Sequence, residues 1–224
     1  MIAMLLAAGR GERMRPVTDT LPKSLVEVGG ASLLERHLAM LAEAGASKVV
    51  INLGWLGDKI VERIGSGKSF GLKVVYSPEY DNVLETGGGI HRALPLLGRD
   101  PFWVVNGDVF SDYQIGADSI ADDCLAHLVL VPTPSHKDIG DFDLDGGKVL
   151  NAERPTLTFS GIGCYRPEFF AGQRPGRFPL APLLRSMADA GKVSGNRYEG
   201  MWHDVGTPER LDEINRQMAS AGNP

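Results

Sequence analysis

The sequence begins with an apolar segment, residues 2–6, that runs directly into a glycine-containing loop at residues 9–11. An apolar strand that ends in such a loop is typical of α/β proteins, which bind ligands at the carboxyl ends of their strands. Gly9 and Gly11 let the backbone approach a ligand closely and present N–H groups to it. The cations in and after the loop are Arg10, Arg13, Arg15 and Lys23. Backbone donors and cations gathered at one strand end predict a polyphosphate site.

The loop differs from two well-known phosphate-binding motifs. A dinucleotide-binding fingerprint requires a third glycine three residues after Gly11, where this chain has Met14. That difference argues against an NAD-dependent oxidoreductase. A P-loop requires Gly-Lys-Ser or Gly-Lys-Thr after a glycine and four intervening residues, and no such string follows the glycines of this loop. Glycine loops also occur for turn geometry alone, so a purely structural loop stays open as an alternative.

Length and composition favour one large α/β domain. A chain of 224 residues with 43% hydrophobic residues can bury a substantial core. The formal net charge of −5 argues against nucleic acid as a partner, because duplex binding needs a basic face. Cys124 and Cys164 show no metal-ligand spacing, and no apolar run is long enough to cross a membrane. We expect a cytoplasmic protein without membrane contact, active as a monomer or small homo-oligomer.

Apolar strands alternate with helical patterns through the first half of the chain. Strands are predicted at residues 2–6, 49–53, 73–76 and 102–105, and helices after residue 32 and over residues 58–64 and 87–97. Ser32 and Glu35 form a capping-box pattern at the first of these helices. The βαβαβαβ order predicts a mostly parallel central sheet that is covered by helices on both faces.

The second half is predicted to be richer in β-structure. Strands are predicted at residues 127–131, 141–144, 148–152 and 156–165, and Asp145-Gly146-Gly147 indicates a hairpin turn. Helices are predicted over residues 180–190 and 207–219, with Thr207 as the N-cap of the second. Trp55 and Trp103 are expected in the core.

Two carboxylates are predicted to lie where strands end. Asp108 follows the apolar strand at residues 102–105, and Asp204 stands just before the helix that begins at Thr207. Mg²⁺ bound to a nucleotide takes one or two protein carboxylates, so the two acids together predict a magnesium site. Each acid could instead form a local turn or cap.

A run of three glycines lies at the start of the helix that follows the third strand, in the string Leu-Glu-Thr-Gly-Gly-Gly at residues 84–89. Glycine in a helix costs about 0.5–1 kcal/mol relative to alanine, so some close backbone approach is expected here. One interpretation is a nucleobase that lies flat on the backbone, and the other is tight packing of the helix on the sheet.

Several polar residues of the second half are candidates for contacts to a polyol such as a sugar. They are Asp141, Glu153, Ser160 and Gly161. A surface salt bridge would explain Glu153 and Arg154 equally well. The histidines show no metal-binding spacing and are given no role.

Taken together, these motifs resemble the sugar-1-phosphate nucleotidyltransferases. The resemblance rests on residues 6–16, 22–23, 84–89, 106–108, 159–161 and 204–207, which follow the family's order over nearly the whole chain. It implies a Rossmann-like, three-layer αβα, GT-A-like domain over residues 1–224. In that domain, residues 1 to about 110 would bind the nucleotide, and the remainder would form a smaller β-rich region that binds the sugar phosphate. The string at residues 84–89 and the single-domain length most resemble members that act in peptidoglycan recycling on UTP and N-acetylmuramic acid 1-phosphate.

The resemblance implies Mg²⁺-dependent transfer of a nucleotidyl group from a nucleoside triphosphate to a sugar 1-phosphate, with release of pyrophosphate. The implied catalytic residues are Arg13, Lys23 and Asp108. The implied nucleotide-binding residues are Leu6, Ala7, Ala8, Gly9, Arg10, Gly11, Glu12, Arg13, Lys23, Glu85, Thr86, Gly87 and Gly88. The implied sugar-phosphate-binding residues are Asn106, Asp141, Glu153, Arg154, Ser160 and Gly161. Asp108 and Asp204 are the implied metal ligands.

The chain departs from related patterns at two places. Many mannose-1-phosphate guanylyltransferases carry Leu-Gly-Thr-Ala-Gly where this chain has residues 84–88. The family often carries Glu-Lys-Pro where this chain has Glu153-Arg154-Pro155. Arginine presents a different donor geometry from lysine, so a phosphate contact by Arg154 stays open. Guanylyl, thymidylyl or uridylyl transfer to mannose or glucose 1-phosphate, and a non-catalytic nucleotide-sugar sensor, are the alternatives. The complete charge set of Arg13, Lys23, Asp108 and Asp204 argues against the sensor.

Overall fold

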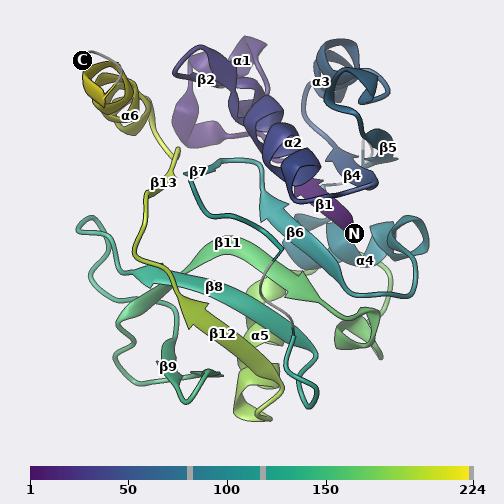
Figure 1. Cartoon of the computed structure of the whole chain (residues 1–224), viewed down its shortest axis with the longest axis vertical. Helices are drawn as coiled ribbons and strands as arrows, with labels where there is room; N and C mark the ends of the chain where they lie inside the picture. Colours follow the sequence, from purple (N-terminus) through teal and green to yellow (C-terminus); the bar gives the residue numbers. More distant parts are fainter. Residues whose placement is uncertain (80–82, 117–119, 222–224) are drawn as a thin grey trace.

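The computed structural model describes residues 1–79, 83–116 and 120–221 and is built around one nine-stranded sheet (Figure 1). The sheet has the strand order β5-β4-β1-β6-β11-β8-β12-β10-β9. Its strands are β1 (Ile2–Leu6), β4 (Lys48–Leu53), β5 (Lys73–Pro78), β6 (Phe102–Asn106), β8 (Ala126–Pro132), β9 (Asp143–Asp145), β10 (Lys148–Leu150), β11 (Leu157–Tyr165) and β12 (Val193–Arg197). Two small ladders stand apart from it: β2 (Glu27–Val28) with β3 (Ala31–Ser32), and β7 (Val109–Ser111) with β13 (Trp202–Asp204).

The helices are α1 (Val17–Thr20), α2 (Leu33–Glu43), α3 (Gly57–Ile64), α4 (Glu85–Leu97), α5 (Leu180–Asp189) and α6 (Pro208–Ala221). Short 3-10 helices cover Glu12–Met14, Lys23–Leu25, Lys68–Phe70 and Pro167–Phe170. Both halves of the predicted capping box are present at the start of α2, where the Ser32 hydroxyl accepts from the Glu35 N–H and the Glu35 carboxylate accepts from the Ser32 N–H. None of the described helices is both long and apolar enough to cross a membrane.

The first-half strands are apolar and pair in parallel. β1 lies between β4 and β6, and β5 pairs with β4 at the edge of the sheet. Successive side chains of these strands point to opposite faces, so both faces must be covered. α2 and α3 cover one face through side chains such as Leu38 and Ile60, and α4 and α5 cover the other through Ile90 and Leu184. The predicted α/β class, with three layers, is confirmed.

The second half adds mainly antiparallel pairs. β11 is antiparallel to β6 and β8, β10 is antiparallel to β9 and β12, and β12 is parallel to β8. Gly146 and Gly147 both have positive φ, as a tight β9–β10 turn requires, so the predicted hairpin is confirmed. The β11–β8 register shifts between Phe159 and Gly163, and Gly161, at φ 81°, lies inside this irregular stretch.

Sequence analysis did not predict every element. β7, β12 and β13 were missed, and α4 begins at Glu85, two residues before its predicted start. The placement of Trp55 in the core was wrong. Trp55 is half-buried, its indole N–H donates to the Thr18 carbonyl over 2.8 Å, and the Arg10 guanidinium lies 4.4 Å from its ring centroid. Trp103 is 4% exposed and does lie in the core.

Candidate active site

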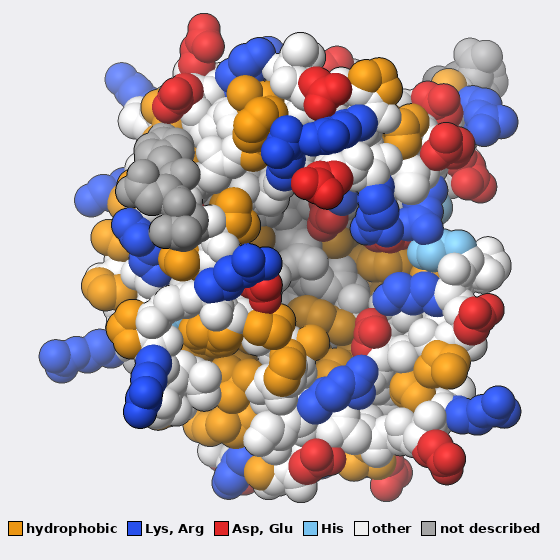
Figure 2. Space-filling model, turned by 180° about the vertical axis from the view of Figure 1, so that it is seen from behind, with side chains coloured by type: hydrophobic (Ala, Val, Ile, Leu, Met, Phe, Trp, Pro, Cys, Tyr) orange, Lys and Arg blue, Asp and Glu red, His pale blue; other side chains and the backbone are white. Residues whose placement is uncertain are grey.

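A cavity of about 280 Å³ lies at the carboxyl ends of β1 and β6. It is lined by Leu6, Ala7, Ala8, Gly9, Gly11, Lys23, Ser24, Asn52, Glu79, Val83, Glu85, Thr86, Asn106, Gly107 and Asp108. Figure 2 shows the face of the molecule that is hollowed near its middle, with charged side chains around the opening. Ten predicted site residues from four separate segments therefore line one cavity, at the strand ends where an α/β sheet binds ligands.

The glycine loop forms one wall of this cavity. Gly11 has φ 66°, and a Cβ there would come within 3.0 Å of the side chains of Lys23 and Thr18. The Thr18 hydroxyl donates to the Gly11 carbonyl over 2.8 Å, which holds the turn. A Cβ on Gly9 would meet no described atom within 4 Å, so the backbone at Gly9 is open to a ligand. The loop conformation thus supports close backbone approach at Gly9 and depends on glycine at position 11.

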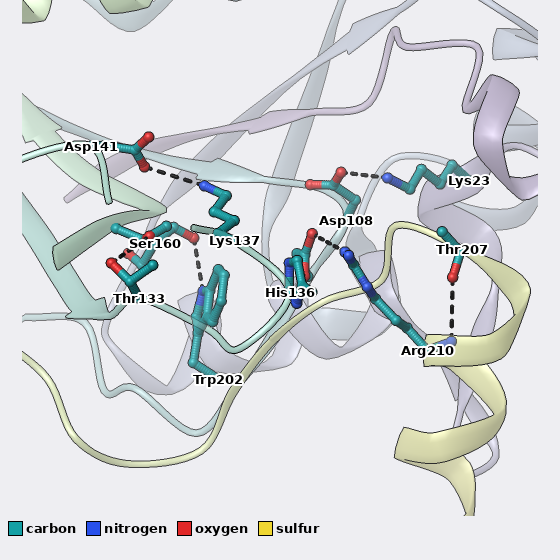
Figure 3. Close-up of polar contacts among 12 residues, drawn as sticks. Lys23, Asp108, Thr133, His136, Lys137, Asp141, Ser160, Trp202, Thr207 and Arg210 are labelled. Carbon is teal, nitrogen blue, oxygen red and sulfur yellow. Dashed lines mark hydrogen bonds and ion pairs between the residues drawn. The ribbon is translucent and has the colours of Figure 1, made fainter. Parts of the chain in front are cut away.

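Lys23 and Asp108 form an ion pair in the cavity, with 2.5 Å between Nζ and Oδ2 (Figure 3). The side chain of Lys23 is only 14% exposed, so its charge is largely withdrawn from solvent. Asp108 reaches this position because Gly107 packs tightly beneath β1: its N–H donates to the Leu6 carbonyl over 2.9 Å, and a Cβ there would lie 2.5 Å from that oxygen. The glycine before the acid is therefore required by packing.

Asp204 lies next to Asp108 through the β7–β13 ladder. Asp204 is paired with Val109, and the Val205 N–H donates to the Asp108 carbonyl over 2.8 Å. The Asp204 carboxylate accepts from Arg210 Nη1 at 2.5 Å and lies 3.6 Å from His136 Nε2. Figure 3 shows Arg210 reaching from α6 toward the carboxylate beside His136.

The two aspartates suit a hard divalent cation. Among the described residues no group of three or more His, Cys, Asp or Glu side chains could hold a metal ion by itself. Mg²⁺ with a nucleotide needs only one or two protein carboxylates, because phosphate and water oxygens complete its shell. Asp108 and Asp204 supply such a donor set. Arg13 lies beside them, with its guanidinium Nη2 3.6 Å from the point where a Cβ on Gly206 would stand.

His37 lies behind Asp108, on α2. Its ring is buried, and burial lowers the pKa of His37 to about 4, while the charge of Asp108 and a backbone hydrogen bond with Val109 act in the opposite direction. Its Nε2 has no partner within the described part of the chain. His37 is therefore neutral near pH 7 and adds no positive charge behind the site.

Asn52 and Glu79 form a buried polar network that sequence analysis missed. The Asn52 side chain accepts from the Ala7 N–H over 2.7 Å and donates to Glu79 Oε1 over 2.9 Å. Glu79 Oε2 accepts from the Leu84 N–H over 3.0 Å. Both side chains line the cavity and tie the glycine loop to the segment that precedes α4. The available signal was a polar residue inside the apolar strand at residues 49–53.

The glycines of α4 have a packing explanation. A Cβ on Gly87 would lie 2.5 Å from the Phe178 ring, and a Cβ on Gly88 would lie 2.2 Å from the Gly176 carbonyl oxygen. The Gly88 N–H donates to the Phe178 carbonyl over 3.0 Å. Neither glycine lines the cavity, whereas Glu85, at φ 60°, and Thr86 do. Close packing against residues 176–178 accounts for these glycines without a nucleobase.

A second cavity of about 250 Å³ adjoins the first, since Thr86 and Asn106 line both. Its other lining residues are Asp141, Phe142, Phe159, Pro179, Leu180, Ala181, Leu184 and Arg185. Of the predicted sugar-phosphate residues, Asn106 and Asp141 lie here. Gly161 supports Asn106 indirectly, because a Cβ on Gly161 would stand 2.6 Å from the Asn106 amide nitrogen.

Other predicted residues lie outside both cavities. Ser160 is buried, with its hydroxyl accepting from the Ile162 N–H and its carbonyl accepting from the Trp202 indole. Glu153 and Arg154 are exposed, line neither cavity, and have no hydrogen bond or ion pair with any described residue. Arg10, Arg13 and Glu12 are exposed beside the glycine loop. The structure brings the segments at residues 6–11, 23, 85–86 and 106–108 together around one cavity, with Arg13 near Gly206, whereas Glu153, Arg154 and Ser160 do not line it.

A cavity at the strand ends of an α/β sheet, with a glycine loop, a lysine and paired carboxylates, defines a nucleotide-binding protein of the nucleotidyltransferase class. The chain belongs to the family of the MobA-like NTP transferase domain, whose model matches residues 3–114. It is 48% identical, over 95% of this chain and 96% of the relative, to N-acetylmuramate alpha-1-phosphate uridylyltransferase of Neisseria meningitidis. The protein of that name from Caulobacter vibrioides is 35% identical over 98% of both chains. The predicted family and enzyme class are confirmed.

The fold is shared with solved structures of low sequence identity. A Bacillus anthracis structure assigned as a glucose-1-phosphate thymidylyltransferase matches with a TM-score of 0.87 at 20% identity, covering 100% of this chain and 98% of the other. Identity at this level bears on the fold alone.

Proposed function

We propose that the chain transfers the uridylyl group of UTP to the phosphate of N-acetylmuramate α-1-phosphate, with release of pyrophosphate. Support comes from the identity to the two named uridylyltransferases over nearly the full length of both. The observation that carries the proposal is the cavity itself, in which the Lys23–Asp108 pair faces the glycine loop at the carboxyl ends of β1 and β6. N-acetylmuramate is a cell-wall sugar and UTP is a cytoplasmic nucleotide, so we assign the enzyme to peptidoglycan recycling in the cytoplasm.

The reaction is a displacement at the α-phosphorus of UTP. An oxygen of the sugar phosphate attacks this phosphorus, the bond from the α-phosphorus to the bridging oxygen of the β-phosphate breaks, and pyrophosphate leaves with the bond's electron pair. The attacking oxygen is already anionic, so the protein needs no general base and no covalent intermediate. Its work is to position the two phosphates and to neutralise charge as the phosphorus passes through its transition state.

The residues that line the cavities receive roles in this displacement. Lys23 and Arg13 would neutralise the triphosphate, and the backbone of Gly9, Arg10 and Gly11 would donate N–H groups to it. The nucleoside would lie along the first cavity, where its remaining proposed contacts are Leu6, Ala7, Ala8, Glu85 and Thr86. The proposed acceptor contacts are Asn106 and Asp141, with Gly161 behind Asn106. Residues 1 to about 110 would thus hold the nucleotide and the rest of the chain the sugar phosphate.

Asp108 and Asp204 would hold Mg²⁺. Bound there, the ion supplies charge neutralisation for the phosphate oxygens. Hard carboxylate oxygens are the ligands that this cation prefers, and the two aspartates are adjacent across the β7–β13 ladder.

A substrate panel tests the proposal directly. The purified chain would be assayed for pyrophosphate release with UTP, CTP, GTP and dTTP against the 1-phosphates of N-acetylmuramate, N-acetylglucosamine, glucose and mannose. The highest kcat/KM is expected for UTP with N-acetylmuramate 1-phosphate, and Asp108→Asn is the control for contaminating activity. A clear preference for GTP with mannose 1-phosphate, or for dTTP with glucose 1-phosphate, would replace the proposal with one of those activities.

A further inference from the structure

The second cavity differs from the first in the chemistry of its walls. Its lining is largely apolar and aromatic, from Phe142, Phe159, Pro179, Leu180 and Leu184. Figure 2 shows hydrophobic side chains gathered along the lower wall of the hollow. Arg185, on α5, is the one cation among its lining residues, and Asp141 is the one acid. An apolar wall with a single cation suits a ligand that carries both a nonpolar substituent and an anion.

Arg185 is held in place on one side and open on the other. Its guanidinium carbon lies 5.1 Å from the centroid of the Phe142 ring. Its Nη1 donates to the Asp141 carbonyl over 3.1 Å and to the Asn151 side chain over 3.2 Å. Within the described chain Nε and Nη2 have no hydrogen-bond partner, and no carboxylate forms an ion pair with Arg185. A guanidinium oriented in this way, with two donors to spare, suits bidentate binding of a carboxylate.

Asp141 does not neutralise this cation. Its Oδ2 accepts from the Phe159 N–H over 3.0 Å and lies 3.4 Å from Lys137 Nζ, so its charge is already balanced locally. Arg177 is paired with Glu85, which lines the first cavity, at 2.8 Å. Arg185 is therefore the cation of the second cavity that is available to an incoming anion.

The shared lining residues orient the acceptor. Thr86 and Asn106 line both cavities, and Asp108 lines the first, so the phosphate of a bound acceptor would lie at this junction. Arg185 lines the second cavity alone, in the part that would hold the body of the sugar. N-acetylmuramate carries an N-acetyl group and, on an ether at C3, a lactyl group with a methyl and a carboxylate. C3 is separated from the phosphate-bearing C1 by C2, which carries the N-acetyl group.

We propose that Arg185 binds the lactyl carboxylate of the acceptor and is the residue that makes the enzyme selective for a muramyl sugar. The proposal rests on the proposed function, because it names a feature of that acceptor. The methyl groups of the acetyl and lactyl substituents would pack on the apolar wall. Asn151 and Phe142 position the guanidinium.

The test measures kcat and KM for two acceptors in the wild type and in Arg185→Gln. N-acetylmuramate 1-phosphate carries the carboxylate, and N-acetylglucosamine 1-phosphate is the same sugar without the lactyl group. Loss of a charge-assisted bidentate contact is expected to lower kcat/KM for the muramyl acceptor by about 10- to 100-fold, mostly through KM. The value for the glucosamine acceptor should change less than about 3-fold, within ordinary mutational scatter. Arg216→Gln, on α6 outside both cavities, is the matched control and should change neither value.

A modified acceptor provides the reciprocal measurement. The methyl ester of the lactyl carboxylate has no charge, so it should be a poor acceptor for the wild type. Arg185→Gln should use the ester and the free carboxylate equally well. Arg185→Lys keeps the positive charge but loses the bidentate guanidinium geometry, so its preference for the carboxylate should fall between those of the wild type and Arg185→Gln. An equal loss with both acceptors in Arg185→Gln, or an unchanged preference for the carboxylate over its ester, would overturn the role of Arg185. Absence of any wild-type activity on the muramyl acceptor would instead refute the proposed function, and this proposal with it.

Discussion

His37 makes the stability of the folded protein depend on pH in a defined window. Burial lowers the pKa of its imidazole from 6.5 to about 4, because the charged form loses its hydration. The unfolded chain keeps the ordinary pKa, so between pH 6.5 and 4 it binds a proton that the folded chain does not bind. The contribution of His37 to the free energy of unfolding is therefore undiminished above pH 6.5, falls as the pH is lowered, and levels off below about pH 4.

The size of this effect follows from the two pKa values. The gap between 6.5 and about 4 corresponds to a total of about 3 kcal/mol, of which about 2 kcal/mol would be lost between pH 7 and pH 4.5. That is a large share of the roughly 5–15 kcal/mol that stabilises a typical domain. Urea unfolding monitored by tryptophan fluorescence at these two pH values, with a chelator present, measures the loss.

The matched variant is His37→Asn, which keeps an amide donor for the Val109 backbone but has no titrating group. Other acids titrate in both proteins, so the comparison isolates the imidazole. The variant should lose about 2 kcal/mol less than the wild type over the same pH interval, whatever its stability at pH 7. Parallel pH dependences in the two proteins would refute the assignment of a buried neutral His37.

Four other changes separate chemistry from packing. Asp108→Asn should stay folded by circular dichroism and lose about 100-fold or more in pyrophosphate release at saturating Mg²⁺, since an amide is a poorer ligand than a carboxylate. Lys23→Ala should lower turnover by a similar factor; a large fall in Tm with activity retained would make Lys23 structural. Gly88→Ala places a Cβ 2.2 Å from the Gly176 carbonyl and should cost about 1–3 kcal/mol in urea unfolding, with or without nucleotide. The Arg63 contact and the cap lower the pKa of Glu35 to about 2, so Glu35→Gln should cost about 1 kcal/mol of capping stability above pH 4.5, and the difference from the wild type should vanish as the pH falls through 2.

The parts of the fold that could be predicted from the sequence are those fixed by local chemistry. An apolar run such as residues 2–6 has few alternatives to a buried strand, and Ser32 with Glu35 satisfies the helix N-terminus through neighbours in sequence. Gly146-Gly147 supplies the two positive φ values that the hairpin needs. The β7–β13 ladder could not be predicted in this way, because three-residue strands pair across a wide gap in the chain and only the packed fold sets their register.

The candidate-site residues that could be predicted are charged residues and glycines that stand in recognisable motifs. An uncharged residue inside an apolar strand, or an arginine on an ordinary helix surface, could not be predicted. Lys23 and Asp108 are distant in sequence. Asp108 follows the end of β6, and Lys23 begins the short 3-10 helix that follows the glycine loop of β1, the strand paired with β6. Asn52 and Arg185 were missed, since one lies within an apolar strand and the other looks like an ordinary exposed residue on a helix. Arg185 becomes notable only when Phe142 and Asn151, from other elements, are seen to orient it.

The ion pairs of the site explain how charges of both signs can share one cavity. Lys23 with Asp108, and Arg210 with Asp204, neutralise one another, which lowers the cost of withdrawing them from water. Under the proposed function, a triphosphate that enters with its own cation would offer each group a new partner: phosphate oxygens for the lysine and arginine, and the cation for the aspartates. Such an exchange would conserve charge, so the site would bind a highly charged ligand without first exposing an unpaired buried group. Lys23→Met would break this balance, because Asp108 would lose the positive charge of the Lys23 ammonium group. Substitutions of the lysine and of the aspartate are therefore both expected to lower activity.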